Sequence, residues 1–205
     1  MKAAIDNLTE LGEMPPPTGP PLLLDDESIH RRGQVYVPNA LKHSTLEVLE
    51  LWEDFVGQEK LKRQLLVHIA YAQETGTRLP HVLLASGHSG VGKTTLSRMV
   101  AQTMEVNIIE LVPPFSIYTL ADAALQLLDG DVLFIDEIHA LAQNGKKGAE
   151  ILLKVLEDHT AYLPNGEVVE LCDITVIGAT TDRDLLPEPV LDRFKLKPFF
   201  EPYTA

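Results

Sequence analysis

The sequence predicts an α/β domain in which a parallel sheet is covered by helices on both faces, giving three layers. Short apolar runs alternate along the chain with segments whose apolar residues recur every three or four positions. The first pattern is typical of buried parallel strands, and the second of amphipathic helices. A glycine-rich turn also lies directly between one such strand and one such helix. We expect ligands to bind beyond the carboxyl ends of the strands, as they do in open parallel sheets.

The individual elements can be placed in chain order. A helix is expected over 54–73, with Leu61, Leu65 and Ile69 on one face, and Gly76 and Pro80 mark the turn that follows it. An Asn-Gly turn within 162–169 predicts a β-hairpin. The expected strands cover 81–85, 106–111, 132–135, 174–178 and a short last segment in 196–200, and the other helices cover 95–104, 120–128 and 149–157.

The glycine-rich segment 87–94 matches the pattern G-x-x-x-x-G-K-[ST] in full. Its position between a strand and a helix favours a P-loop NTPase fold, because the amide groups at the start of the helix then face the bound phosphates. We expect Lys93 to reach the β- and γ-phosphates and the Thr94 hydroxyl to bind Mg²⁺. The predicted triphosphate-binding residues are Gly87, His88, Ser89, Gly90, Val91, Gly92, Lys93 and Thr94.

Two acidic residues close the apolar strand 132–135, 43 positions after Lys93. Asp136 at the strand tip is a candidate Mg²⁺ ligand, commonly acting through water. Glu137 is a candidate general base for the attacking water, which requires only hydrogen-bond reach and a suitable pKa. In another setting such a pair would be a solvated strand end, but its place in this α/β pattern favours catalysis.

Two further positions complete the candidate site. Thr180 and Thr181 follow the next apolar strand, where a hydroxyl could hold water or contact the γ-phosphate; alternatively they simply end the strand. Arg193 lies too far along the chain for us to expect it in its own phosphate pocket. It is a candidate arginine finger that acts on a neighbouring subunit, and the alternative is a surface arginine paired with Asp192.

Residues 1–45 differ in composition from the expected domain at 46–205. They contain the proline-rich run 14–21, which cannot pair in a helix or sheet, followed by Leu22, Leu23 and Leu24. We expect a disordered or extended N-terminal tail. Two alternatives are a docking segment for a protein partner within 14–32, anchored by the leucines, and a segment that folds back near the nucleotide.

The composition limits the function classes. The formal net charge of −13 argues against a broad DNA-binding surface, although DNA held at a few basic points stays possible. The single cysteine excludes an internal disulfide within the chain and a cysteine-rich zinc site. No apolar run approaches the roughly 20 residues of a membrane helix, and no signal-peptide core is present at the start. We expect a cytoplasmic protein with no membrane partner.

With these residues assembled, the chain resembles the large domain of the AAA+ ATPases, and within them the RuvB family of Holliday-junction branch-migration motors. The resemblance covers about residues 46–200. The glycine-rich segment 87–94, called the phosphate loop below, and the strand 132–135 with its two closing acids are typical of the AAA+ superfamily. The combination of 136–139 with 178–181 points to the RuvB family within it. The similar segments are 55–62, 81–84, 92–96, 130–139, 178–181 and 192–194.

The resemblance implies a role for each matching residue. Lys93 and Thr94, with Thr95 beside them, would bind ATP and Mg²⁺, Asp136 would organise the metal, and Glu137 would activate water. Thr181 would be the first sensor and Arg193 the finger in trans, while Phe55 and Val56 would border the adenine. The family works as a hexameric ring that couples ATP hydrolysis to pulling duplex DNA, so the resemblance implies a homo-oligomer and DNA as a partner.

Other features of the chain depart from the family pattern. The arginine-proline pair that precedes the segment at Phe55 is absent, and the hairpin within 162–171 is shorter than in the family. Up to Ala205 the chain holds neither the helical lid nor the winged helix, so we expect a fragment or a reduced relative with weak turnover alone. Two alternatives stay open: a clamp-loader-like or protein-remodelling module, and a nucleotide-gated scaffold that binds partners through its tail.

Overall fold

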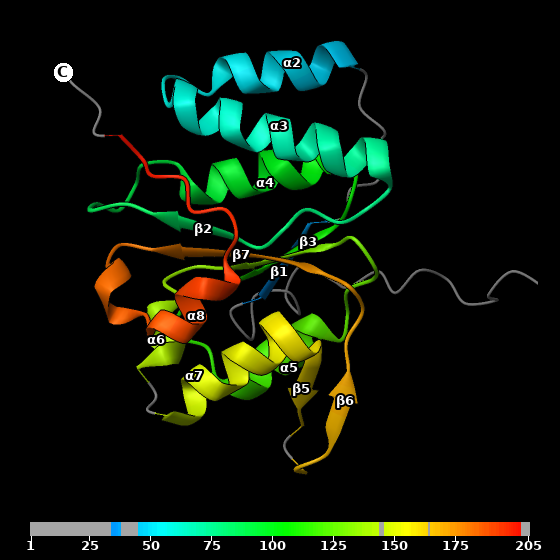
Figure 1. The fold of residues 1–205 in the computed structure, drawn as a ribbon, viewed down its shortest axis with the longest axis vertical. Coiled ribbons are helices and arrows are strands. Elements are labelled where there is room, and N and C mark those ends of the chain that lie inside the picture. The colour runs from blue at the N-terminus through cyan, green and yellow to red at the C-terminus, as the bar shows by residue number, and fades with distance from the viewer. Residues whose placement is uncertain (1–33, 38–44, 144–145, 164, 202–205) are drawn as a thin grey trace, which may run out of the picture.

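The structure is a computed structural model that describes residues 34–37, 45–143, 146–163 and 165–201. Its centre is a five-stranded sheet in the order β1-β3-β4-β7-β2 (Figure 1). The chain after residue 193 adds two parallel bridges to β2, at Leu196 and Phe199, where the short last strand is expected. The strands are β1 (Gln34–Val37), β2 (Val82–Ala85), β3 (Ile108–Leu111), β4 (Val132–Ile135) and β7 (Thr175–Thr180).

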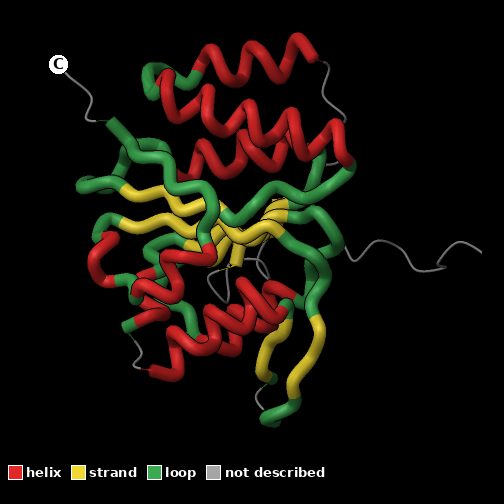
Figure 2. Tube along the Cα trace, viewed as in Figure 1, coloured by secondary structure: helices red, strands yellow, loops and turns green. Residues whose placement is uncertain are grey.

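Helices cover both faces of this sheet, which confirms the three-layer prediction (Figures 1 and 2). One face carries α2 (Thr45–Asp54), α3 (Glu59–Thr75) and α4 (Lys93–Met104). The other face carries α5 (Ile117–Ala124), α6 (His139–Ala142), α7 (Lys146–Leu153) and α8 (Glu188–Arg193). A π-helical segment, Lys154–Asp158, continues α7, and a 3₁₀ turn, Arg183–Leu185, precedes α8.

The apolar strand residues divide between two cores because successive side chains of a strand point to opposite faces. In β4, Leu133 and Ile135 belong to the core under α5 to α8. Val132 and Phe134 belong to the core under α2 to α4. All four side chains are buried, so β4 is covered on both faces, as continuous apolar strands require.

The predicted hairpin is confirmed. Strands β5 (Thr160–Tyr162) and β6 (Val168–Glu170) pair antiparallel and project away from the sheet (Figure 2). Gly166 adopts φ 84°, a left-handed conformation that suits glycine in the turn. Val168 of β6 is exposed, whereas Ala161 of β5 is buried.

The structure differs from the sequence prediction at several boundaries. Residues 34–37, assigned to the N-terminal extension, form β1, which pairs antiparallel with β3 at the edge of an otherwise parallel sheet. The helix α3 begins five residues later than expected, because Gly57 and Gln58 are left-handed and interrupt the helix there. The helix α5 begins three residues early, because Ser116 caps it through the amide of Thr119.

Two further expectations concern partners. The proposed docking segment within 14–32 lies outside the described residues. Among the residues that the structure describes, no helix is long and apolar enough to cross a membrane.

Candidate functional site

The sheet order brings the predicted site residues to one edge. Strand β7 lies between β2 and β4 and is parallel to both. Ala85 of β2 pairs with Thr180, and Ile135 of β4 pairs with Gly178. The loop after β2, the acidic pair after β4 and Thr181 after β7 therefore leave the sheet at the same, carboxyl edge.

The phosphate loop has the backbone that its glycines allow. Gly90 has φ 76° and Gly92 has φ 96°, in the left-handed region that side chains disfavour. A Cβ atom on Gly92 would also lie 2.8 Å from Cε2 of Phe55, so glycine is required there for space as well. Among the loop residues, Gly87, His88, Ser89 and Gly90 are exposed, as is Thr95; Val91, Gly92 and Thr94 are half-buried.

Lys93 is the buried member of the loop, and its ammonium points back into it. Its Nζ donates to Ser86 Oγ at 2.9 Å and to the carbonyl oxygen of His88 at 3.4 Å. Ser86 Oγ in turn donates to the same carbonyl at 2.6 Å. Ser86 was not predicted from the sequence, although it stands directly before the first glycine of the motif.

Asp136 follows β4 and is held at the strand tip. Its Oδ1 accepts a hydrogen bond from the amide of Glu137 at 3.0 Å. Burial raises the pKa of the Asp136 carboxyl; the charge of Glu137 raises it too, while that amide and nearby Lys93 oppose the rise. The described residues contain no group of three His, Cys, Asp or Glu side chains that could hold a metal ion.

Glu137 is held by contacts from Thr181, the residue that directly follows β7. The Glu137 backbone has φ 45°, a left-handed conformation that costs a non-glycine residue about 1–2 kcal/mol. Thr181 donates to the Glu137 carboxylate through its amide at 3.1 Å and through its hydroxyl at 3.0 Å. His139 also approaches that carboxylate, with Nδ1 at 3.2 Å from Glu137 Oε2. Strained backbone of this kind concentrates at functional sites.

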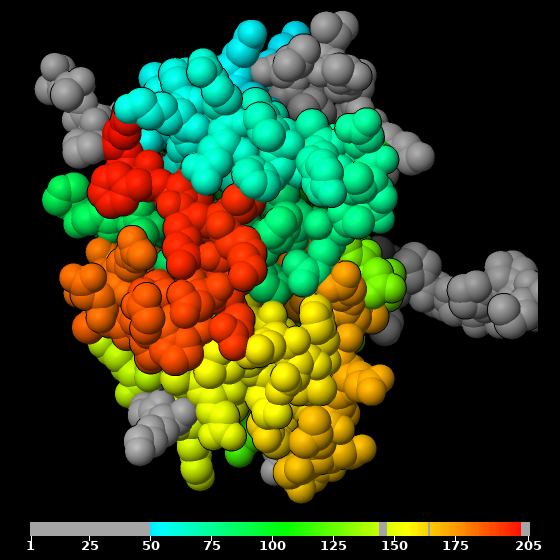
Figure 3. All heavy atoms as spheres, in the orientation of Figure 1, coloured from blue at the N-terminus to red at the C-terminus, as the bar shows by residue number. Residues whose placement is uncertain are grey.

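Arg193 lies apart from these residues, at the amino edge of the sheet. It is the last residue of α8 and precedes the bridge between Leu196 and the first residue of β2. Nε and Nη2 both donate to Glu157 Oε2, at 2.8 and 2.6 Å, so its partner is Glu157 and not Asp192. The segment after β7, orange to red in Figure 3, runs across the molecular surface.

The two predicted adenine neighbours differ in exposure. Phe55 is buried beneath the phosphate loop, next to Gly92. The Val56 side chain is 76% exposed. Beside them, Gln58 uses its side-chain amide to bind the backbone N–H and C=O of Glu201 at 2.9 and 2.8 Å. This link between the start of α3 and the end of the described chain was not predicted.

Comparison with known proteins shows the family to which the chain belongs. Residues 49–198 match the family described as the Holliday junction DNA helicase RuvB P-loop domain. RuvB subunits of the Holliday junction branch migration complex from Nitratiruptor sp. and Helicobacter hepaticus are 38% and 37% identical. The matches cover 75% and 74% of this chain but 47% and 48% of the relatives. The chain thus spans about half the length of these relatives.

Solved structures give the same result. The RuvB Holliday junction branch migration motor of Thermotoga maritima is 35% identical, with a TM-score of 0.63 over 74% of this chain and 48% of its own. A mutant of that protein gives 34% identity and a TM-score of 0.65, with the same coverage. NtrX from Brucella abortus, in complex with ADP, shares the fold, with 17% identity, a TM-score of 0.52 and coverage of 75% and 39%.

Proposed function

The chain belongs to the RuvB P-loop domain family, and we propose that it binds ATP with Mg²⁺ and hydrolyses it as the nucleotide-binding domain of a DNA motor. The observation that carries this proposal is the convergence of Lys93, Asp136 and Glu137 at one edge of the sheet. The Lys93 ammonium would bind the phosphates, the Asp136 carboxylate would bind the metal ion, and the Glu137 carboxylate would activate the attacking water. Nucleotide binding as such is a property of the P-loop family to which the chain belongs.

Phosphate binding rests on the loop and the start of α4. The helix begins at Lys93, so its first amide groups face the loop and favour an anion. The Lys93 ammonium, which otherwise donates to Ser86 and His88, would turn to the β- and γ-phosphate oxygens. Exchange of these neutral acceptors for a charged one strengthens the hydrogen bonds.

The residues present fit Mg²⁺. Within the described chain, Oδ1 of Asp136 accepts a hydrogen bond and Oδ2 accepts none, so one oxygen is available to a cation or its water. Because burial raises the pKa of this carboxyl, a nearby cation would stabilise its charged form. Thr94 would supply the second protein ligand. When bound, Mg²⁺ would neutralise charge on the phosphates.

We assign general-base catalysis to Glu137. A carboxylate oxygen would accept a proton from the attacking water, whose oxygen bonds to the γ-phosphorus as the bond to the bridging oxygen breaks and ADP leaves. The contacts from Thr181 support this role, because they fix the carboxylate from the strand beside the phosphate loop. Thr181 would thereby report the state of the γ-phosphate to Glu137.

Arg193 would act on a neighbouring copy. Strand β2 alone spans about 13 Å at 3.3 Å per residue, and the guanidinium and phosphate loop lie beyond its opposite ends. An arginine side chain does not cover that length, so Arg193 cannot serve its own loop. Assembly into a ring would bring it to the adjacent nucleotide, where such a finger stabilises charge on the transferring phosphoryl group.

DNA is the proposed substrate of the motor, and the cytoplasm its proposed location. The similar proteins from Nitratiruptor sp. and Helicobacter hepaticus are subunits of a Holliday junction branch migration complex, which supports a DNA role. Since the net charge is −13, DNA would be held at a few local points, and binding would weaken with salt.

Two variants test the site. Lys93→Ala should lose nucleotide binding, measured by titration with a fluorescent ATP analogue and Mg²⁺. Glu137→Gln should bind ATP with unchanged affinity but release no phosphate. Unchanged nucleotide affinity in Lys93→Ala would remove this loop as the binding site and with it the proposed function.

A further inference from the structure

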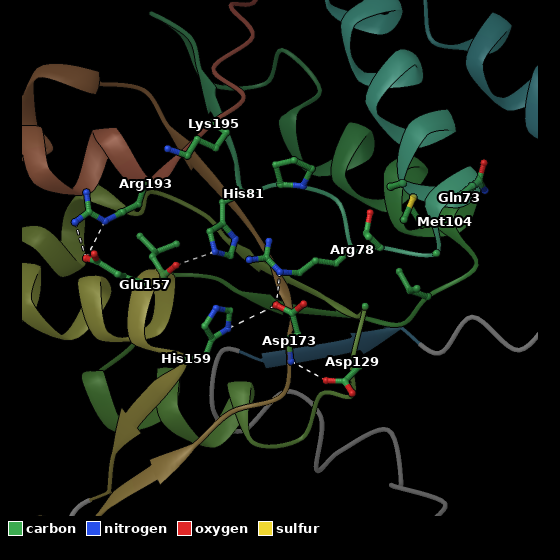
Figure 4. Close-up of a pocket in the computed structure, with 17 residues that line it drawn as sticks. Gln73, Arg78, His81, Met104, Asp129, Glu157, His159, Asp173, Arg193 and Lys195 are labelled. Carbon is green, nitrogen blue, oxygen red and sulfur yellow. Dashed lines mark hydrogen bonds and ion pairs between the residues drawn. The ribbon is translucent and has the colours of Figure 1, made fainter.

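A cavity of about 1170 Å³ opens at the amino edge of the sheet, away from the phosphate loop. Charged side chains from several loops line it, and they form two separate groups, one around Asp173 and the other between Arg193 and Glu157 (Figure 4). Arg78 pairs with Asp173 before β7, and Arg193 pairs with Glu157 after α7. In Figure 4 the second pair lies at one side of the cavity, beyond His81.

We propose that Glu157 is a positioning residue, which orients the Arg193 guanidinium toward the phosphates bound to a neighbouring copy of this chain. The inference rests on the proposed function, in which Arg193 acts in trans. It adds a residue for which the sequence motifs provide no signal, because Glu157 lies 36 positions before Arg193 in a segment outside every motif.

The hydrogen-bond geometry leaves the phosphate-binding edge of Arg193 available. A guanidinium has five N–H donors in a planar fork. Two of them, on Nε and Nη2, converge on the single oxygen Oε2 of Glu157. The remaining three lie on Nη1 and the outer side of Nη2. That outer edge can bind two phosphate oxygens while Glu157 stays in place.

The backbone on both sides of this pair is fixed. Phe194, the next residue after the arginine, is 1% exposed, and Leu191 before it is also buried. Glu157 lies in the π-helical segment Lys154–Asp158, whose residues Val155 and Leu156 are buried. The flexible part is therefore the long arginine side chain itself, and Glu157 is the group that restricts it.

Stability alone does not account for the pair. The Glu157 side chain is 50% exposed and that of Arg193 is 34% exposed, so solvent screens their attraction. Exposed pairs of this kind contribute little to folding. Restricting one guanidinium near a shared active site, in contrast, directly affects a step in which an arginine finger contributes about 10³–10⁵ in rate.

The chain offers a matched control. Asp158 pairs with Lys154 at 2.6 Å on the same π-helical segment, in a similarly exposed setting, and does not contact Arg193. Asp158→Ala therefore removes an equivalent ion pair without freeing the arginine. Glu157→Gln keeps an acceptor oxygen in place of Oε2 but removes the negative charge. It therefore tests whether hydrogen bonding alone is enough to orient the Arg193 guanidinium.

The experiment measures ATP turnover across a range of chain concentrations. Glu157→Ala should lower kcat about 10-fold with an unchanged KM for ATP, Glu157→Gln should recover part of that loss, and Asp158→Ala should match the unaltered chain. The double variant Glu157→Ala/Arg193→Ala should be no slower than Arg193→Ala. Equal kcat for Glu157→Ala and Asp158→Ala, or a rise in kcat, would overturn the inference.

Mixtures separate this inference from the proposed function. Glu137→Gln chains carry an intact finger and Arg193→Ala chains an intact base, so an equimolar mixture should exceed both alone. Glu157→Ala should gain in the same way when mixed with Glu137→Gln, but not when mixed with Arg193→Ala. If the first mixture stays inactive, the trans role of Arg193 fails, and this inference with it. If only the Glu157→Ala mixtures depart from the expected pattern, the positioning role alone is wrong.

Discussion

Gly178 in β7 is the point at which the two halves of the candidate machinery are packed together. A Cβ atom at this position would lie 2.9 Å from Ile138 Cδ1 and 3.2 Å from Phe194 Cζ. Ile138 directly follows Glu137, and Phe194 directly follows Arg193. Both are almost fully buried, so neither side chain can move aside into solvent. We therefore expect the methyl group of Gly178→Ala to perturb both the proposed base, Glu137, and the proposed finger, Arg193.

The size of the effect follows from these distances. Carbon atoms pack best about 3.5–4.0 Å apart, so each neighbour must retreat by several tenths of an ångström. Overpacking of this kind costs about 1–3 kcal/mol. The loss of backbone freedom in the unfolded chain offsets about 0.4–1 kcal/mol. We expect Gly178→Ala to lower the free energy of unfolding by about 1–2 kcal/mol, and Tm by about 2–8 °C for a domain of this size.

Urea denaturation followed by circular dichroism measures this change. The midpoint should fall with an unchanged slope, because the surface exposed on unfolding stays the same. Gly87→Ala is the stability control, since a Cβ there meets nothing within 4 Å. Phosphate release by Gly178→Ala should also decrease while ATP affinity is retained. A variant as stable as the unaltered chain would refute the packing argument.

Two other predictions concern buried ionisable groups. His81 Nδ1 accepts from the Val176 amide at 2.9 Å, and burial lowers its pKa to about 4. The unfolded chain takes up this proton near pH 6.5, so up to about 3 kcal/mol of stability, present above pH 6.5, is lost as pH falls toward 4. His81→Gln should flatten that part of the curve of unfolding free energy against pH; an unchanged slope would exclude His81 as its source. Arg98 binds the buried Glu110 at 2.5 and 2.8 Å, so Arg98→Ala should cost about 2–3 kcal/mol, whereas Arg98→Ala/Glu110→Leu should recover most of it in the same urea assay.

The central strands could be predicted from the sequence because burial on both faces leaves a continuous apolar run. Val132–Ile135 is such a run, and the structure confirms its position. The edge strand Gln34–Val37 has the same length but carries no such signal, since it begins with a polar residue and its pairing with β3 is a non-local contact. The start of α3 was placed early, because nothing in the local pattern indicated that Gln58 would be left-handed.

The candidate site likewise contains residues that a local sequence pattern predicts and contacts that it does not. Contiguous motifs give the phosphate loop and the acidic pair, whose residues are set by local chain geometry. Partners that lie far apart in sequence give no pattern: the contact of Thr181 with Glu137 spans 44 positions, and that of Arg193 with Glu157 spans 36. They depend on how α7, α8 and the sheet pack. The half of the site supplied by a neighbouring copy stays a prediction.

We propose that ATP is hydrolysed at this carboxyl edge of the sheet with Glu137 as the base. The most direct test is phosphate release by Glu137→Gln at saturating ATP and Mg²⁺, with bound nucleotide quantified in the same sample. We expect one ATP retained per chain and phosphate release at the level of the buffer blank. Phosphate release at the rate of the unaltered chain would contradict it.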